Sequence, residues 1–510
     1  MTSTFRGYVA CACFALALAA LVGASPSPST SPGTPTPNPV PTRPLAAPSP
    51  SLPDTSPFGQ IGKLERNRTT KPSQLAPFLQ STDPAIVARA AIAIGRLHSR
   101  DGVALLVPLL SGQQPDNVKA AAAFALGLIG SADALSPLRS AALHGSPLVA
   151  GTAADSLGRI GGSAAIETLT HLLDNGSPFV RGKAAIGIGE SGFATKPQIT
   201  ELLKSTTGKL LDNAFVTERD QEARWRMAWA IYRSYYDANP GLLRTMLNDS
   251  EELVRLYAVK AVGRLKDRTF LTPVRLLSSD PSWRVRIEVS NVLKALGDNS
   301  PVDTRPPAIP PEDQAEPSPL PSNAPIGDHP QVAIVTNKGV IVVELFPDAA
   351  PYHVDAFAHL VDIGFYNNTQ LDRVIPDFVV QGGNPDAGKP NGSGGPGFNV
   401  PDEVNQIEQL TGMLALGLDY SQQNRPVLDS AGSQYYITES PQLHLDESFS
   451  TFGRVVKGLA VVYNTSAHDP NKPNIPADIV TRMYRCEPVT PQTPEIELKL
   501  RTVEVGYNPR

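Results

Sequence analysis

Apolar residues recur in a fixed pattern along much of the N-terminal half of the chain. Seven ten-residue segments place apolar side chains mostly at their first, fifth, sixth and ninth positions, which is the spacing of one helix face. The segments begin at Ile86, Val118, Val149, Val180, Ala223, Val254 and Val285. Successive segments begin 31 or 32 residues apart, except for one step of 43 residues. A constant period of this length predicts a solenoid of helical units.

Residues around these segments predict where each helix begins and ends. Asp or Ser followed by Pro precedes several segments, as at Asp83 and Ser146, and such pairs cap and open helices. Glycine stands at the tenth position of several segments, as at Gly95, near the predicted helix end. A second, leucine-rich helix fills each gap, for example Val103–Leu110. Each unit is therefore predicted to be a helix pair that buries one face against the next.

This pattern resembles short bacterial HEAT-like repeats, and we assign residues 59–300 to such a solenoid. Its function is open between a concave surface that binds a client or partner and a plain spacer. Two features could mark a special contact, an insertion near Lys204–Asp220 and an aromatic-rich unit. The aromatic residues are Trp225, Trp229, Tyr232, Tyr235 and Tyr236. Aromatic side chains at helical spacing are more often core, so we expect them to be buried.

From Gln331 onward the apolar period changes from that of a helix to that of a strand. The segment VAIVTNKGVIVVELF alternates apolar and polar residues and predicts two strands joined by a tight turn at Asn337–Gly339. Pro351 then opens a predicted helix, and short strands separated by glycine-rich loops follow. Few helices among many short strands predict an α+β or barrel domain.

Composition divides the chain of 510 residues further, since that length suggests about three domain-sized units. Many of its 50 prolines lie in two stretches that have little to bury, and we predict linkers at 25–58 and 301–330. The first linker would hold the next domain away from a membrane or wall. The second would act as a tether between the solenoid and the C-terminal domain.

The N-terminus has the features of a signal peptide, predicted over residues 1–24. Arg6 is basic, Val9–Val22 is apolar, and small residues precede Ser25. An uncleaved membrane anchor is the alternative. Cys11 and Cys13 lie within this segment, so the mature chain keeps Cys486 and has no internal disulfide. We therefore expect an exported, bacterial-type protein that is periplasmic, wall-associated or extracellular.

Several classes of function are disfavoured by what the chain lacks. The net charge is −5 and no basic run points to a nucleic-acid partner. A G-x-G-x-x-G match at 392–397 has prolines where a dinucleotide site needs a strand and a helix. The histidines form no zinc-ligand pattern, and His353 and His359 are expected to face solvent. We expect neither a metal nor a cofactor.

Several sequence blocks after residue 331 together resemble the cyclophilin family. They include GVIVVELFPDAAPYHVDAFAHLVDIGFY, LDRVIPDFVVQGGNP, TGMLALG, SQYYI and FGRVVKG, in cyclophilin order and spacing. The resemblance covers 331–508. It implies an eight-stranded antiparallel β-barrel capped by two helices, and peptidyl-prolyl cis/trans isomerase activity on Xaa-Pro bonds without a cofactor.

The resemblance also assigns site residues. Arg373 matches the catalytic arginine, and Gln381 matches the polar residue that positions the arginine and the substrate. The remaining matched positions hold the proline ring or pair with the substrate backbone. They are Phe378, Val379, Gly417, Leu418, Tyr436, His444, Leu445 and Phe449. Val379 and Tyr436 stand where the family often has Met and Phe, and Phe449 stands where a well-known member has His. That member has Trp at the position of His444, although His is also common there, and the loop from Asp419 to Gly432 is longer than in compact members.

The chemistry explains why such a site needs no nucleophile. Rotation of the planar amide is opposed by about 18–20 kcal/mol, and no bond is broken. A cation near the substrate carbonyl or prolyl nitrogen favours the twisted amide, while an apolar pocket holds the ring. We therefore predict an isomerase of exported polypeptides whose HEAT-like repeats bind a client or partner. The alternative is a non-catalytic proline-binding scaffold, and clients, sequence preference and oligomeric state stay open.

Overall fold

The computed structural model describes residues 55–191, 206–234, 239–321, 324–385, 394–422, 425–446, 448–470 and 476–491. The predicted signal peptide, nearly all of the first linker, Tyr235, Tyr236, the start of the insertion at Lys204 and the end of the C-terminal assignment lie outside the described residues. Within those ranges, no helix combines the length and the apolar character needed to cross a bilayer.

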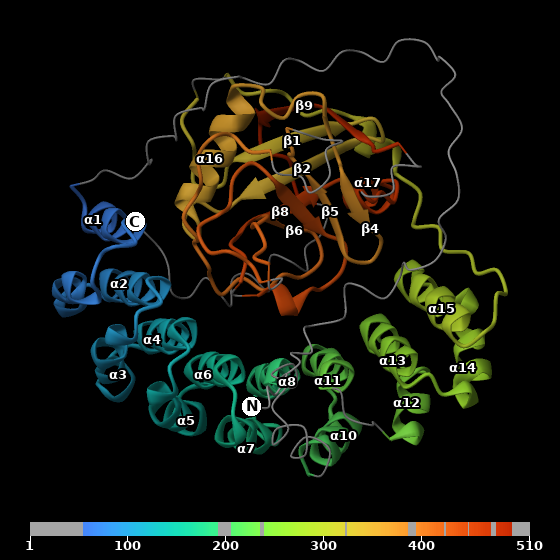
Figure 1. Ribbon diagram of the computed structural model, residues 1–510, viewed down its shortest axis with the longest axis horizontal. Helices are drawn as coiled ribbons and strands as arrows, with labels where there is room; N and C mark the ends of the chain where they lie inside the picture. The colour runs from blue at the N-terminus through green and yellow to red at the C-terminus, as the bar shows by residue number, and fades with distance from the viewer. Residues whose placement is uncertain are drawn as a thin grey trace, which may run out of the picture.

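The first half of the described chain is a curved stack of helix pairs (Figure 1). One helix of each pair lines the inner side of the curve. These inner helices are α2 (Pro84–Arg96), α4 (Asp116–Ile129), α6 (Pro147–Ile160), α8 (Pro178–Ser191), α11 (Gln221–Arg233), α13 (Glu252–Leu265) and α15 (Trp283–Ala295). The outer helices are α3 (Val103–Ser111), α5 (Leu135–His144), α7 (Ser163–Leu172), α10 (Gly208–Thr217), α12 (Pro240–Met246) and α14 (Leu271–Leu276). Helix α1 (Pro57–Arg66) precedes the stack.

Small residues explain why the inner helices can stack so closely. A Cβ atom at Gly95 of α2 would lie 2.6 Å from the Cα of Ala125 in α4, which is too close for any side chain. Of the two named caps, Asp83 is confirmed, since its side chain accepts a hydrogen bond of 2.9 Å from the Ala85 amide. Ser146 stands at the N-cap of α6, but its side chain makes no capping hydrogen bond. Trp225 and Trp229 are buried in the helical core, as predicted for aromatic residues at helical spacing.

The C-terminal domain is built on one curled antiparallel sheet. Its order is β3-β9-β1-β2-β8-β6-β7-β5-β4, with β1 (Gln331–Thr336) and β2 (Val340–Leu345) forming the predicted hairpin. The other strands are β3 (Thr369–Gln370), β4 (Arg373–Ile375), β5 (Val379–Gly382), β6 (Met413–Leu416), β7 (Tyr435–Thr438), β8 (Thr451–Lys457) and β9 (Ile479–Cys486). This described part has nine strands where the resemblance implies eight, and β3 is only two residues long. Two helices accompany the sheet, α16 (Pro351–Asp362) and α17 (Leu459–Tyr463).

One histidine lies in a different place from the one expected. His353, in the first turn of α16, is 1% exposed instead of facing solvent. Both its backbone amide and its ring Nδ1 lie 2.9 Å from Oε2 of Glu403. The carboxylate comes from a loop fifty residues away, so the periodicity of the helix alone could not predict this burial.

The predicted tether contains the short 3-10 helix η8 (Pro311–Gln314), and its residues 318–320 follow the surface of the C-terminal domain. The amide of Leu320 donates to the carbonyl of Arg485 at 2.8 Å, and the amide of Glu487 donates to the carbonyl of Ser318 at 2.9 Å. These bonds add residues 318–320 alongside the end of β9. The described part of this linker is therefore attached along the sheet edge.

The two domains are in direct contact, with the sheet domain lying on the inner side of the helical curve (Figure 1). Ion pairs join them, including Arg68, just after α1, to Asp429 at 2.7 Å and Lys260 of the inner helix α13 to Asp377 at 2.7 Å. Arg96 of α2 donates to the carbonyl of Val404 at 2.8 Å. The inner face that was predicted as a binding surface thus contacts another part of the same chain.

Candidate active site

Arg373 and Gln381 are brought together by the β4–β5 hairpin. The two residues are directly paired in the antiparallel register, so their side chains lie on the same face of the sheet. The guanidinium of Arg373 donates to Oε1 of Gln381 at 3.4 Å, and Nε2 of Gln381 donates to Oε1 of Gln434 at 3.0 Å. Burial lowers the pKa of Arg373, but an arginine remains a cation at neutral pH.

Phe378 lies between the cation and His444. Its ring centroid is 5.7 Å from the Arg373 guanidinium carbon and 5.9 Å from the His444 ring, which is nearly parallel to it at 16°. The residue before it, Asp377, has a left-handed backbone with φ of 59°, and this turn directs Phe378 into the site. Phe378 is half-buried, as expected for the rim of a pocket.

The other predicted apolar residues form a continuous wall. Val379, Leu418, Tyr436, Leu445 and Phe449 all belong to one buried cluster, against which Phe378 packs. The rings of Tyr436 and Phe449 meet edge to face with centroids 5.7 Å apart. The Tyr436 hydroxyl donates to Oε1 of Gln409 at 2.7 Å, which satisfies its polar atom within the protein. Tyrosine can therefore occupy this position and still present an apolar ring.

Gly417 and Leu418 directly follow β6 beside the polar end of the site. The Gly417 amide donates to the carbonyl of Gln434 at 2.8 Å. A side chain at Gly417 would begin 3.8 Å from Nε2 of Gln381, so the glycine lies next to the predicted polar residue. All ten predicted site residues are thus associated with the same end of the sheet, around β4, β5, the end of β6 and β7.

His444 is neutral at physiological pH. Burial is the main cause and the nearby cations Arg233 and Lys260 add to it, lowering the pKa of His444 to about 3. Both cations belong to the repeat domain, and the adjacent Leu443 is fully buried in the repeat core. His444 therefore acts as an uncharged aromatic wall.

Sequence reasoning missed the polar residues that hold the site from behind. Gln434 supports Gln381 and Gln409 supports Tyr436. Gln434 belongs to the block SQYYI, so its proximity to Tyr436 could have identified it. Nothing in the pattern around Gln409 marks it, because its role depends on how a loop folds back onto β7.

Among the described residues, no three His, Cys, Asp or Glu side chains are grouped so as to hold a metal ion. Cys486 is buried at the end of β9. The first residues of the glycine-rich run at 392–397 lie outside the described ranges. The predicted site residues thus combine one cation, Arg373, and its polar support, Gln381, at the edge of an apolar wall.

Comparisons with known proteins match two separate parts of the chain to two families. Residues 331–486 match the family described as cyclophilin type peptidyl-prolyl cis-trans isomerase/CLD. Residues 72–145, 103–189 and 239–304 match the family described as HEAT repeats.

Individual relatives resemble the C-terminal domain. Peptidyl-prolyl cis-trans isomerase-like 1 of Mus musculus is 34% identical over 151 residues, covering 30% of this chain and 88% of its own length. Peptidyl-prolyl cis-trans isomerase B of Bacillus subtilis is 37% identical, covering 26% of this chain and 87% of its own. A solved cyclophilin-type isomerase of Cryptosporidium parvum is 26% identical, covers 32% of this chain and 99% of its own, and has a TM-score of 0.28.

Proposed function

The chain belongs to the cyclophilin family of peptidyl-prolyl cis-trans isomerases, and we propose that it acts on Xaa-Pro bonds of exported polypeptides. We propose further that Arg373 and Gln381 are its catalytic residues and that the apolar wall around Phe378 holds the proline ring. The convergence of Arg373, Gln381 and Phe378 on one half-buried site carries this proposal.

The proposed mechanism follows from what each group can do to a planar amide. The apolar wall holds the proline ring while the acyl side of the bond rotates. Arg373 donates to the substrate carbonyl or the prolyl nitrogen and favours the twisted, less conjugated amide. Gln381 fixes the guanidinium from one side, so that little reorganisation is needed when the twist develops.

A magnitude limits what Arg373 supplies. A hydrogen bond to a charged group contributes about 1.5–3 kcal/mol. Because each tenfold change in rate corresponds to about 1.4 kcal/mol, the arginine accounts for roughly one to two decades. The rest of the acceleration is assigned to the preorganised, largely dry pocket.

An NMR-exchange assay of the full chain on an Xaa-Pro peptide tests the proposal. The Arg373→Ala variant is expected to lose at least about tenfold in kcat/KM. Arg482→Ala is the matched control, because Arg482 on β9 is 58% exposed and pairs with Glu316 away from the site. If wild type and both variants bind the peptide equally without accelerating exchange, the domain is a proline-binding scaffold.

Export is the second part of the proposal and rests on the N-terminal sequence. Arg6, the apolar run Val9–Val22 and the small residues before Ser25 support it. Expression in a bacterium with an intact secretion system should yield a mature chain that begins at Ser25. A chain that keeps Met1 and sediments with membranes would instead favour the anchor.

The HEAT repeats are proposed to bind a client or partner beside the pocket. The proposal is supported by the position of Leu443, which packs on the repeat core while its neighbour His444 stacks on Phe378. A client chain leaving the pocket past His444 would therefore meet the repeats. A proline peptide with a photo-crosslinking residue beside the proline should label the repeats; labelling confined to residues 331–491 would oppose this role.

A further inference from the structure

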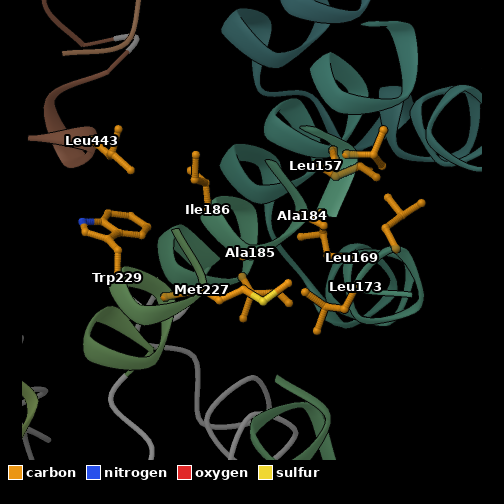
Figure 2. Close-up of a cluster of buried hydrophobic side chains, with 14 of the residues drawn as sticks. Leu157, Leu169, Leu173, Ala184, Ala185, Ile186, Met227, Trp229 and Leu443 are labelled. Carbon is orange, nitrogen blue, oxygen red and sulfur yellow. The ribbon is translucent and has the colours of Figure 1, made fainter. Parts of the chain in front are cut away.

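Within the described residues, three contacts of the repeat domain lie beside the proposed proline pocket. The first is Leu443, in the short 3-10 helix η9 (Leu443–Leu445). Figure 2 shows Leu443 pointing toward Trp229 of α11 and Ile186 of α8. Its side chain is fully buried and belongs to the repeat core, whereas Leu445, two residues later, belongs to the pocket wall. The two faces of η9 are thus shared between the domains.

The second contact holds the turn before Phe378. Nζ of Lys260, on α13, lies 2.7 Å from Oδ2 of Asp377. The Asp377 amide donates to the Glu439 carboxyl group at 2.7 Å, and the Asp377 carbonyl accepts from the Ser440 hydroxyl at 2.7 Å. This left-handed residue is fixed at its amide, carbonyl and side chain, and the side-chain partner comes from the repeats.

The third contact lies behind Tyr436 and η9. Lys183 of α8 and Arg226 of α11 bind the two carboxylate oxygens of Glu408 at 3.0 and 2.5 Å. Although burial alone raises the pKa of Glu408, these two cations lower it to about 2, so the carboxylate is charged at neutral pH. Glu408 precedes Gln409, which links the loop to the pocket.

Gln409, next to Glu408 in sequence, forms hydrogen bonds with two residues of the proposed pocket. Its side-chain oxygen accepts from the Tyr436 hydroxyl at 2.7 Å, and its Nε2 donates to the Leu445 carbonyl at 3.2 Å. Its amide donates to Asp446 at 2.7 Å. Tyr436 and Leu445 are both predicted proline-pocket residues. An unbroken series of contacts therefore runs from α8 and α11 to the proline side of the site.

We propose that the HEAT repeats position the proline pocket, with Lys260 acting through Asp377 and Lys183 with Arg226 acting through Glu408 and Gln409. These are positioning residues, since none of them lies in the pocket. Buried ion pairs of this kind contribute little net stability but fix one arrangement, because a charge left without its partner is strongly disfavoured. The inference rests on the proposed roles of Phe378, Tyr436 and Leu445.

The test compares full-length variants in the same exchange assay, with peptide affinity measured in parallel. Lys260→Met and Lys183→Met shorten the unbranched side chain by only one atom and remove its charge. Each is expected to raise KM, and the peptide Kd, at least threefold and to lower kcat/KM about five- to tenfold. Lys209→Met makes the same change on exposed α10 and should leave every value within twofold.

Two readouts separate positioning from loss of fold. A variant that merely loses folded molecules lowers the apparent kcat at an unchanged KM, whereas a displaced pocket wall raises KM. Lys260→Arg keeps the charge and should restore KM to within twofold of wild type. Unchanged KM and Kd in both methionine variants, or a rise in kcat/KM, would overturn the inference.

The inference and the proposed function can fail separately. A wild-type chain that binds the peptide without accelerating its exchange contradicts the catalytic proposal, yet the Kd values still test positioning. A wild-type chain that is active while the methionine variants match it contradicts positioning alone.

Discussion

Glu439 is a buried carboxyl group at the junction of the two domains. It is 1% exposed, and burial, with a smaller contribution from the Asp377 carboxylate, raises its pKa to about 8 despite the nearby Arg284. A carboxyl group whose pKa is higher in the folded than in the unfolded chain favours folding while it is protonated. Its contribution is therefore complete below the unfolded pKa of 4.5 and is lost as the pH rises through 8.

Replacing Glu439 by Gln should remove this pH dependence. We expect the free energy of unfolding of the wild type to fall between pH 4.5 and 8 more steeply than that of Glu439→Gln. Glutamine can still accept the hydrogen bond from the Asp377 amide, so the variant should fold. Urea denaturation at several pH values provides the measurement, and parallel curves for the two chains would contradict the assignment.

Gly458 occupies a position that requires glycine for two reasons, its backbone conformation and the space around it. Its φ is +85°, and a Cβ atom there would collide with the carbonyl oxygen of Val340. Gly412 has a similar φ of +79°, but the nearest atom to its Cβ would be at 3.5 Å, an ordinary contact. Both glycines have a left-handed backbone, but only at Gly458 would a Cβ atom also overlap with another strand.

Alanine at these two positions should therefore have unequal effects. Gly412→Ala is expected to cost about 1–2 kcal/mol of stability, the strain of a left-handed residue with a side chain. Gly458→Ala should cost more, about 3 kcal/mol or above, because the Val340 strand must also move. Thermal unfolding of both variants checks this prediction. Equal losses of stability would contradict it and would show that the Val340 strand can move at little cost.

Helices and strands of this fold could be predicted where the signal lies within the segment itself. The seven inner helices follow from apolar spacing and caps, and the β1–β2 hairpin follows from alternation around a tight turn. Arg373 and Gln381 could be assigned together by resemblance, and the hairpin register explains why they meet. The burial of His353 could not be predicted, because its partner Glu403 comes from an irregular loop.

Element η9 joins the two domains through Leu443, which is fully buried against the repeats. Leu443→Ala should lower stability by about 2–5 kcal/mol, the range for leucine lost from a packed core. The control is Leu276→Ala, since Leu276 is 75% exposed and should change stability by less than about 0.5 kcal/mol. Thermal unfolding measures both, and a near-neutral Leu443→Ala would mean that the interface closes around the missing side chain.

At the scale of the molecule, the docking of the domains could not be predicted from sequence. Lys183, Arg226 and Lys260 lie on three different helices of the repeats, where charged residues usually face solvent. Their partners Glu408 and Asp377 lie in loops of the other domain. Each residue is unremarkable in its own segment, and only the curvature of the solenoid brings them together.

The docked arrangement predicts that the tether is dispensable for association. A specific protease site inserted after Arg305, whose side chain is 86% exposed, should allow the linker to be cut. Because the ion pairs between the domains and the packing of Leu443 on the repeats remain, the two fragments should still elute together in size-exclusion chromatography. Separate elution of the fragments would contradict the interface, and the uncut chain with the same insertion is the control.

The inner curve of the repeats also restricts which polypeptide substrates can reach the proposed pocket. One side of the pocket, from Phe378 to His444, is backed by α8, α11 and α13, so approach is open from fewer directions than in an isolated barrel. A proline set flat in the surface of a finished globular protein would be kept away by steric collision with the solenoid. Prolines on unfolded chains or protruding loops can enter, and these are the prolines whose exchange takes tens to hundreds of seconds and delays folding. We therefore expect this enzyme to act on prolines in unfolded or partly folded chains in preference to prolines in folded proteins.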